Sequence, residues 1–267
     1  MLKSKTVKML AAAVVLLVAL FQSCKSEYDA LLNSTDVDQK YNAAFNYFNH
    51  GKFNKAARLF ESLAVQTSGS AKDDTVQFYW GMSNYRYKDY YTAETNFQQY
   101  LNYFPQGAFA EMAEFLRIDC LYRATLRYEL DQTATYTAIT AIGEYLTAHP
   151  EGANADICRH RMEELGERLD RKAYENAKIY YRMEDYLAAR VALRNVLKDD
   201  ADNVFREEIL YYTAMASYKY ADMSVPAKKK ERFLVFQDDY LNFIGEYPES
   251  SHRKELDGLY NRVKEKN

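Results

Sequence analysis

Residues 74–105 read DTVQFYWGMSNYRYKDYYTAETNFQQYLNYFP and contain two helical patterns joined by a short polar turn. Two antiparallel helices approach closely only where small side chains lie at their crossing, and aromatic rings fill the space beside it. Gly81 and Ala93 are the small residues, and Pro105 ends the second helix because proline cannot continue one. The aromatic residues at the intervening sites are Tyr90, Phe97 and Tyr100. The segment therefore predicts a closed helical hairpin.

We take this segment as a unit of about 34 residues that begins at Asp74. The same spacing of small and aromatic residues occurs in two other units, without insertions or deletions. The other units begin at Val37 and Asp170. Small or turn residues recur at Ala44, Gly51, Ala56, Ala177 and Ala189, and large residues at Tyr47, Phe53, Phe60, Tyr180, Tyr186 and Leu193. This is the pattern of the tetratricopeptide repeat, a helix-turn-helix unit. We therefore expect an all-α, tetratricopeptide-repeat solenoid, with a generic helical bundle as the alternative.

The remaining segments continue the helical pattern. We expect helices over 108–128, 135–148, 153–183, 204–222, 227–246 and 251–265, with Pro150 and Pro248 ending two of them. Five hairpins and a C-terminal helix result. Hairpins 1–3 would occupy 37–150, and hairpins 4–5 with the terminal helix would occupy 151–267.

The N-terminus resembles a bacterial lipoprotein signal. Three lysines precede an apolar run at 9–21, which is shorter than the ~20 residues that span a bilayer. Ser23 then precedes Cys24, as in a lipobox, although Leu20 lies one place further upstream than usual. We expect a signal peptide over 1–23 and a lipid on Cys24.

A flexible polar tether would follow over 24–36, and an ordinary secretory signal or a short membrane helix is the alternative. Removing 1–23 removes three lysines and no acid, which takes the formal net charge from −3 to −6. A mildly acidic chain argues against nucleic acid as the principal partner.

Catalytic and metal-binding patterns are not found in the sequence. No HExxH, GxSxG or phosphate-binding glycine loop occurs, and the four histidines are scattered. We expect no enzyme activity, no metal and no cofactor apart from the covalent lipid on Cys24. Cys120 and Cys158 each lie within a helical pattern, so buried free thiols are expected, with a bridge between them as the alternative.

A binding surface is better supported by the sequence. In this repeat the first helix of each hairpin lines the inner face of the solenoid. The residues at the inner positions of the first two hairpins are Tyr41, Phe45, Phe48, Phe78, Met82, Tyr85 and Arg86. Aromatic side chains dominate recognition sites, and an Arg fork suits a carboxylate. These residues form a candidate peptide-binding groove, and packing between hairpins is the alternative use of the aromatic rings.

Five segments together are similar to the BamD family of outer-membrane lipoproteins. They are CKSEYDALLNSTD (24–36), KYNAAFNYFNHGKFNKAARLFESL (40–63), YRYKDYYTAETNFQQYLNYFP (85–105), YELDQT (128–133) and ENAKIYYRMEDYLAA (175–189). The resemblance covers essentially the whole mature chain. It departs from the family in the lipobox and in the missing proline after the fourth hairpin.

The resemblance implies five tetratricopeptide hairpins held at the outer membrane by a lipid, facing the periplasm and without a catalytic site. It implies that the N-terminal repeats receive the aromatic-rich C-termini of unfolded outer-membrane proteins. It further implies that the C-terminal repeats dock on a BamA-like barrel protein. A tetratricopeptide lipoprotein that serves secretion, gliding or cell-envelope coordination is the alternative, and a helical enzyme is a third possibility.

Overall fold

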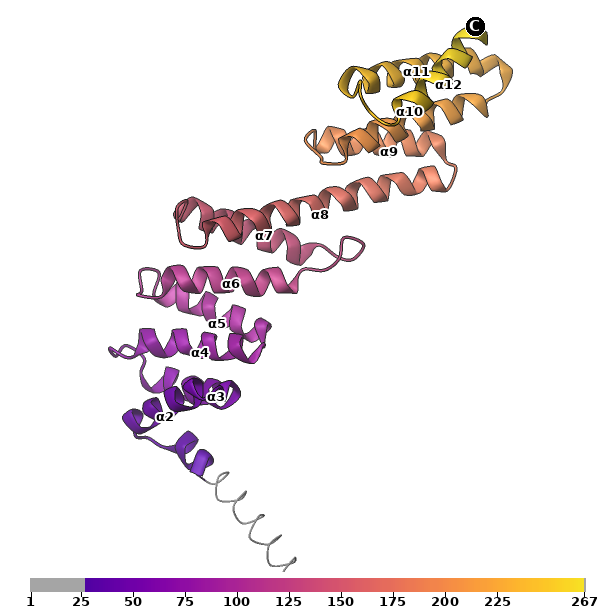
Figure 1. Ribbon diagram of the computed structural model, residues 1–267. Coiled ribbons are helices and arrows are strands. Elements are labelled where there is room, and N and C mark those ends of the chain that lie inside the picture. Colours follow the sequence, from indigo (N-terminus) through magenta and orange to yellow (C-terminus); the bar gives the residue numbers. More distant parts are fainter. Residues whose placement is uncertain (1–26, 267) are drawn as a thin grey trace, which may run out of the picture. The chain divides into compact units, whose positions relative to one another are not determined.

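The computed structural model describes residues 27–266, and helices dominate this part of the chain (Figure 1). The helices are α2 Val37–Asn49, α3 Phe53–Gln66, α4 Asp73–Tyr87, α5 Tyr90–Tyr103, α6 Ala110–Ala124, α7 Thr133–Ala148, α8 Ala155–Arg182, α9 Tyr186–Asp199, α10 Arg206–Asp222, α11 Pro226–Glu246 and α12 Arg253–Lys266. No strand occurs within 27–266. The predicted all-α architecture of five hairpins and a terminal helix is confirmed. The predicted signal peptide and Cys24 lie outside the described residues.

Two compact units divide the chain. The first comprises the chain up to Thr125 together with residues 140–154, and the second comprises residues 126–139 and the chain from Ala155 onward. Residues 126–139 therefore group with the second unit. The sequence pattern predicts them as part of hairpins 1–3, over 37–150. None of the helices within 27–266 has the length and apolar character needed to cross a membrane.

The second hairpin closes where a glycine faces an aromatic ring. A Cβ atom added to Gly81 would lie 2.8 Å from Cε1 of Phe97 and 2.9 Å from its Cδ1. Because carbon atoms cannot approach so closely without displacement, only glycine fits this crossing. Ala56, Ala93 and Ala189 occupy the small position on the second helix of hairpins 1, 2 and 4, and they are completely buried. The repeat register predicted from the sequence is confirmed at these sites.

The hairpin turns share one backbone conformation. Gly51, Lys88 and Glu184 occupy the same position of three 34-residue units, and their φ angles are 71°, 70° and 61°. This left-handed conformation is ordinary for glycine and costs other residues about 1–2 kcal/mol. In the latter two hairpins the next residue is an aspartate that caps the second helix. Asp89 accepts from the backbone N–H of Thr92 at 3.1 Å, and Asp185 does the same for Ala188.

The expected flexible tether over 24–36 is wrong for its described part. Residues 27–33 are helical, and Tyr28 is buried in the core of the first hairpin. Its hydroxyl donates to the backbone oxygen of Lys55 at 3.0 Å. Leu31 and Leu32 pack against the same core. The polar residues around these three side chains predict a tether, but tertiary contact orders the segment as a helix.

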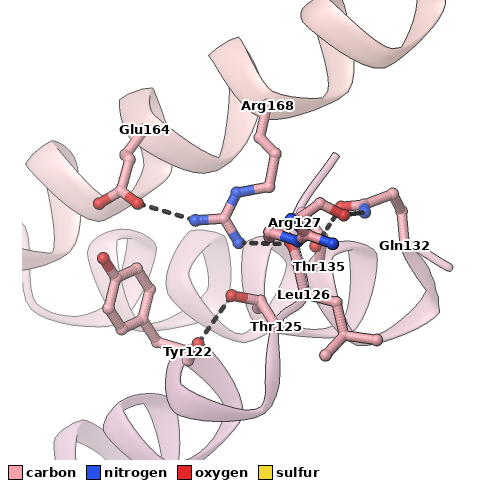
Figure 2. Close-up of polar contacts among 8 residues, drawn as sticks. All are labelled: Tyr122, Thr125, Leu126, Arg127, Gln132, Thr135, Glu164 and Arg168. Atoms are coloured by element: carbon pink, nitrogen blue, oxygen red, sulfur yellow. Dashed lines mark hydrogen bonds and ion pairs between the residues drawn. The ribbon is translucent and has the colours of Figure 1, made fainter. Parts of the chain in front are cut away.

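In the second unit, the loop at 126–132 is held by two basic residues one turn apart on α8. Arg168 donates to the Leu126 oxygen at 3.1 Å while its other nitrogen donates to Glu164 at 2.8 Å (Figure 2). Lys172 donates to the oxygens of Tyr128 and Leu130 at 3.1 and 2.7 Å. The YELDQT segment is thus a backbone-anchored loop, and the helix expected to reach residue 128 ends at Ala124.

The glycine crossing predicts a contrast between two substitutions. Gly81→Ala should lower the stability of the protein by about 1–3 kcal/mol, because its methyl group displaces the Phe97 ring. Gly166→Ala on α8 is the control, since nothing lies within 4 Å of its added Cβ. It should instead stabilise the helix by about 0.5–1 kcal/mol. Thermal unfolding followed by circular dichroism measures both, and equal midpoints for the two variants would contradict the assigned crossing.

Candidate binding surfaces

The seven candidate groove residues lie on α2 and α4, both in the first unit. Tyr41, Phe45 and Phe48 come from α2, and Phe78, Met82, Tyr85 and Arg86 come from α4. On α2 the rings of Tyr41 and Phe45 lie 4.9 Å apart, centre to centre. All three α2 residues are half-buried.

Tyr79 connects these rings and was not singled out from the sequence. Its ring lies 4.7 Å from that of Phe45 and 5.2 Å from that of Phe48, in edge contacts. It also contacts Phe78 at 5.6 Å and Phe109 at 6.1 Å. Tyr79 therefore joins the aromatic residues of three successive hairpins. Tyr79 directly follows the candidate residue Phe78 on α4, and the sequence pattern does not predict its contacts with the neighbouring hairpins.

Phe78 packs inside the protein. Its side chain is 4% exposed, and its ring stacks on Phe109 with the centres 4.4 Å apart. It also makes an edge contact with Tyr100 at 5.8 Å. The structure thus uses this ring between hairpins 2 and 3. The remaining aromatic members of the groove keep part of their surface in solvent.

Tyr85 takes part in a buried polar contact. Its hydroxyl donates to the Asp119 carboxylate at 2.8 Å, and Arg123 donates to the same carboxylate. Asp119 is buried. Burial, followed by the hydrogen bond to Asp119, raises the pKa of Tyr85 to about 12. The hydroxyl is therefore protonated at neutral pH and available as the donor.

Arg86 is the exposed cation of the groove. Its guanidinium carbon lies 5.1 Å from the centre of the Phe53 ring, across the junction between hairpins 1 and 2. Within residues 27–266 no carboxylate forms an ion pair with it. A ring beneath the guanidinium fixes its plane, which leaves its hydrogen-bonding edge open to a carboxylate.

A second surface is a cleft of about 570 Å³ between α9, α10 and α11 in the second unit. Two bidentate ion pairs cross it. Arg190 donates to Asp239 at 2.6 and 3.0 Å, and Arg206 donates to Glu246 at 2.7 and 2.9 Å. The sequence gives no signal of this cleft, because its paired residues lie 49 and 40 positions apart.

The α9 side of the cleft also carries cations that no acid neutralises. Arg194 and Lys198, one turn apart, line it and are exposed. Neither forms an ion pair with another residue of the described chain. This side is therefore suited to an acidic partner surface.

Other chemistry is sparse in the described chain. No group of three or more His, Cys, Asp or Glu residues that could hold a metal occurs within 27–266. Cys120 and Cys158 are both buried free thiols. Burial raises the pKa of the Cys120 thiol to about 12, which keeps it protonated and unreactive.

Stacked helical hairpins with exposed candidate surfaces are typical of a repeat-built scaffold protein. The chain belongs to the YfiO family, described as outer membrane lipoprotein, whose model matches residues 33–234. This confirms the resemblance to the BamD family. The match includes α2, α4 and the basic α9 side of the cleft.

A solved structure is also similar to this chain. It is the crystal structure of a TPR repeats protein from Bacteroides fragilis NCTC 9343, at 15% identity and a TM-score of 0.41. The similarity covers 88% of this chain and 100% of that one. No curated protein matches the chain.

The Tyr85–Asp119 bond predicts a pH-dependent contribution to stability. Tyr85→Phe should cost about 1–3 kcal/mol at pH 7, because it leaves a buried carboxylate with one donor fewer. The pKa of Tyr85 is raised on folding from 10.0 to about 12. The contribution is therefore complete below pH 10 and is lost as the pH rises towards 12.

Urea unfolding of the wild type and Tyr85→Phe between pH 7 and 12 measures this difference. Tyr87→Phe, at an exposed neighbouring tyrosine, is the control and should change little. A Tyr85→Phe deficit that stays constant up to pH 12 would show that the hydroxyl bond is not its source.

Proposed function

We propose that this chain is a non-catalytic scaffold and receptor subunit of outer-membrane protein assembly. A lipid on Cys24, its one covalent cofactor, holds it at the outer membrane, facing the periplasm. The observation that carries the proposal is the family match over 33–234, because this range includes the candidate groove and the α9 and α10 sides of the cleft. The membrane is reached through the lipid anchor, and nucleic acid is not a partner.

The inner face of hairpins 1 and 2 receives the C-termini of unfolded outer-membrane proteins. Phe78 is buried and supports the surface from below, so the direct contacts come from the partly exposed Tyr41, Met82 and Tyr85. These side chains offer apolar contact to an aromatic residue at the end of the substrate. Arg86, fixed over Phe53, donates to the terminal carboxylate.

Arg86→Ala should weaken binding of a free-acid peptide ending in an aromatic residue about tenfold or more, since a hydrogen bond to a charged group is lost. The C-terminal amide of the same peptide should lose much less. The difference between acid and amide should shrink at high salt because the site is open to solvent. Fluorescence anisotropy with both peptides measures these affinities.

Two matched variants separate binding from folding. Arg58→Ala removes an exposed cation from α3 and should leave both affinities unchanged. Phe78→Ala should lower the thermal midpoint through loss of the Phe109 contact. If Arg86→Ala weakened the affinity for the free-acid peptide and for the amide equally, Arg86 would not bind the terminal carboxylate.

The cleft between α9, α10 and α11 docks a periplasmic domain of a BamA-like barrel protein. Asp239 and Glu246 are already engaged by Arg190 and Arg206, and the third acid of the cleft, Asp238, lies exposed on α11. The positive charge available to an acidic partner therefore comes from Arg194 and Lys198 on the α9 side. Docking of an acidic surface neutralises these two cations without breaking the pairs that shape the cleft. Complementary charge chiefly sets the specificity and rate of such an encounter.

Arg194→Glu combined with Lys198→Glu should abolish co-purification of the barrel protein from detergent-solubilised membranes, as measured by mass spectrometry. Lys254→Glu, an exposed charge reversal on α12, is the control and should retain it. Recovery of secretion-motor, gliding or peptidoglycan-synthesis proteins with the wild type, in place of a barrel protein, would instead support the alternative scaffold role.

A further inference from the structure

The chain enters the fold at the turn end of the first hairpin. The ring of Tyr28 lies 5.4 Å from that of Tyr47, and its hydroxyl bonds to the Lys55 oxygen. Tyr47 is near the end of α2 and Lys55 near the start of α3, so both flank the turn between these helices. Tyr28 therefore fixes where the N-terminal segment leaves the first unit.

The anchor position is close to this turn in sequence. Tyr28 lies four positions after Cys24, and a fully extended chain covers at most about 3.6 Å per position, or about 14 Å here. A lipid on Cys24 would therefore hold the backbone of Tyr28, which packs beside the turn of hairpin 1, within about 14 Å of the anchor. This inference rests on the lipid anchor of the proposed function.

The turn of hairpin 2 lies at the same edge of the unit, because Arg86 at the end of α4 covers the Phe53 ring at the start of α3. Two lysines and two tyrosines are among the exposed residues in and beside these two turns, and we call these four the turn edge. They are Lys52, Tyr87, Lys88 and Tyr91.

The two tyrosines of the turn edge are unusually open to solvent. Tyr91 is 86% exposed and Tyr87 is 56% exposed. Asp89 lies between them in sequence, but its carboxylate is engaged by the backbone and hydroxyl of Thr92 at 3.1 and 2.8 Å. The edge therefore presents two tyrosine rings and two lysines.

This combination suits the surface of a phospholipid bilayer. Tyrosine has an apolar ring and a polar tip, and it is enriched where membrane meets water. Lysine can lay its methylene stem along the apolar layer while its ammonium group remains with the phosphates. Anionic lipids add an electrostatic attraction that acts over about a Debye length.

We propose that the turn edge of the first two hairpins is a membrane contact, in which Tyr87 and Tyr91 lie at the level of the lipid headgroups. Lys52 and Lys88 bind the phosphates of anionic phospholipids. The lipid on Cys24 holds the chain at the membrane, and the turn edge fixes which side of the first unit faces it.

Helix α5 provides an internal control. Tyr103 lies at its opposite end and is 63% exposed, similar to Tyr87. It lies 12 positions after Tyr91 on the helix, which corresponds to about 18 Å at 1.5 Å per position. If the turn edge contacts the membrane, Tyr91 should therefore lie close to the lipid and Tyr103, on the same helix, should not.

The test uses full-length lipoprotein in which Trp80, the one tryptophan, is replaced by Phe. Tyr91→Trp and Tyr103→Trp are each reconstituted into vesicles of phosphatidylcholine and phosphatidylglycerol with brominated acyl chains, which quench nearby tryptophan. We expect Tyr91→Trp fluorescence to fall at least twice as far as that of Tyr103→Trp. Similar quenching of both would overturn the proposal.

Charge variants test the lysines. Lys52→Gln with Lys88→Asn should reduce the quenching of Tyr91→Trp in phosphatidylglycerol vesicles and leave it unchanged in neutral ones. Asparagine is chosen at position 88 because it tolerates the left-handed backbone found there. Unchanged quenching in both vesicle types would remove the lysines from the contact.

Flotation of the same vesicles separates this inference from the anchor. Protein that floats, while Cys24→Ala does not, supports the lipid on Cys24 whatever the quenching shows. Floating protein with an unquenched Tyr91→Trp refutes the turn edge alone. If acrylamide access to that tryptophan falls only when envelope proteins are added, the edge binds protein and the membrane contact is wrong. Failure of the wild type to float refutes both.

Discussion

The two helices of a hairpin in this protein can pack closely only where a glycine or alanine on one helix faces the other helix at the crossing. The contact is tightest at Gly81, where even a Cβ atom would lie 2.8 Å from the Phe97 ring and would displace it. Ala56 and Ala189 serve the equivalent crossings elsewhere and have no exposed surface. With the helices this close, the larger rings cannot all point into their own hairpin. They cover its outer faces, which must then be buried against the next hairpin.

The contact between hairpins 1, 2 and 3 follows from this requirement. Tyr79 contacts the rings of Phe45 and Phe109, which belong to the hairpins on either side of its own. Arg86 then covers Phe53 at 5.1 Å, and the same arrangement returns one hairpin later, where Arg123 covers Tyr90 at 4.9 Å. In both α4 and α6, a cation near the end of the first helix thus covers the aromatic residue that begins the preceding second helix. Arg86, the candidate hydrogen-bond donor to a peptide carboxylate, is therefore held by the same contact that packs hairpin 1 against hairpin 2.

The register of the hairpins could be predicted because the spacing of small and aromatic residues is a local property of the chain. The left-handed backbone of Lys88 could not, since the packed helices impose it on a residue that does not favour it. For the candidate groove, the exposed position of Arg86 follows from its place on α4. The stacking of Phe78 on Phe109 depends on the junction with hairpin 3, which no spacing within hairpin 2 specifies. The cleft lined by Arg194 was invisible for the same reason.

The perturbed ionisable groups have a structural explanation. Strongly shifted pKa values often mark catalytic sites, where they gather in one cleft. Here raised tyrosine pKa values are spread along the chain, and many belong to hydroxyls bonded to a carboxylate. The pairs are Tyr85–Asp119, Tyr100–Asp74, Tyr145–Glu111, Tyr211–Glu255 and Tyr240–Asp257. A buried phenol that stays protonated can donate to an acid at the edge of the core, which satisfies both groups and fixes one helix against another. The many tyrosines of this chain therefore join apolar packing to polar connection between helices, and the outer surfaces remain for binding.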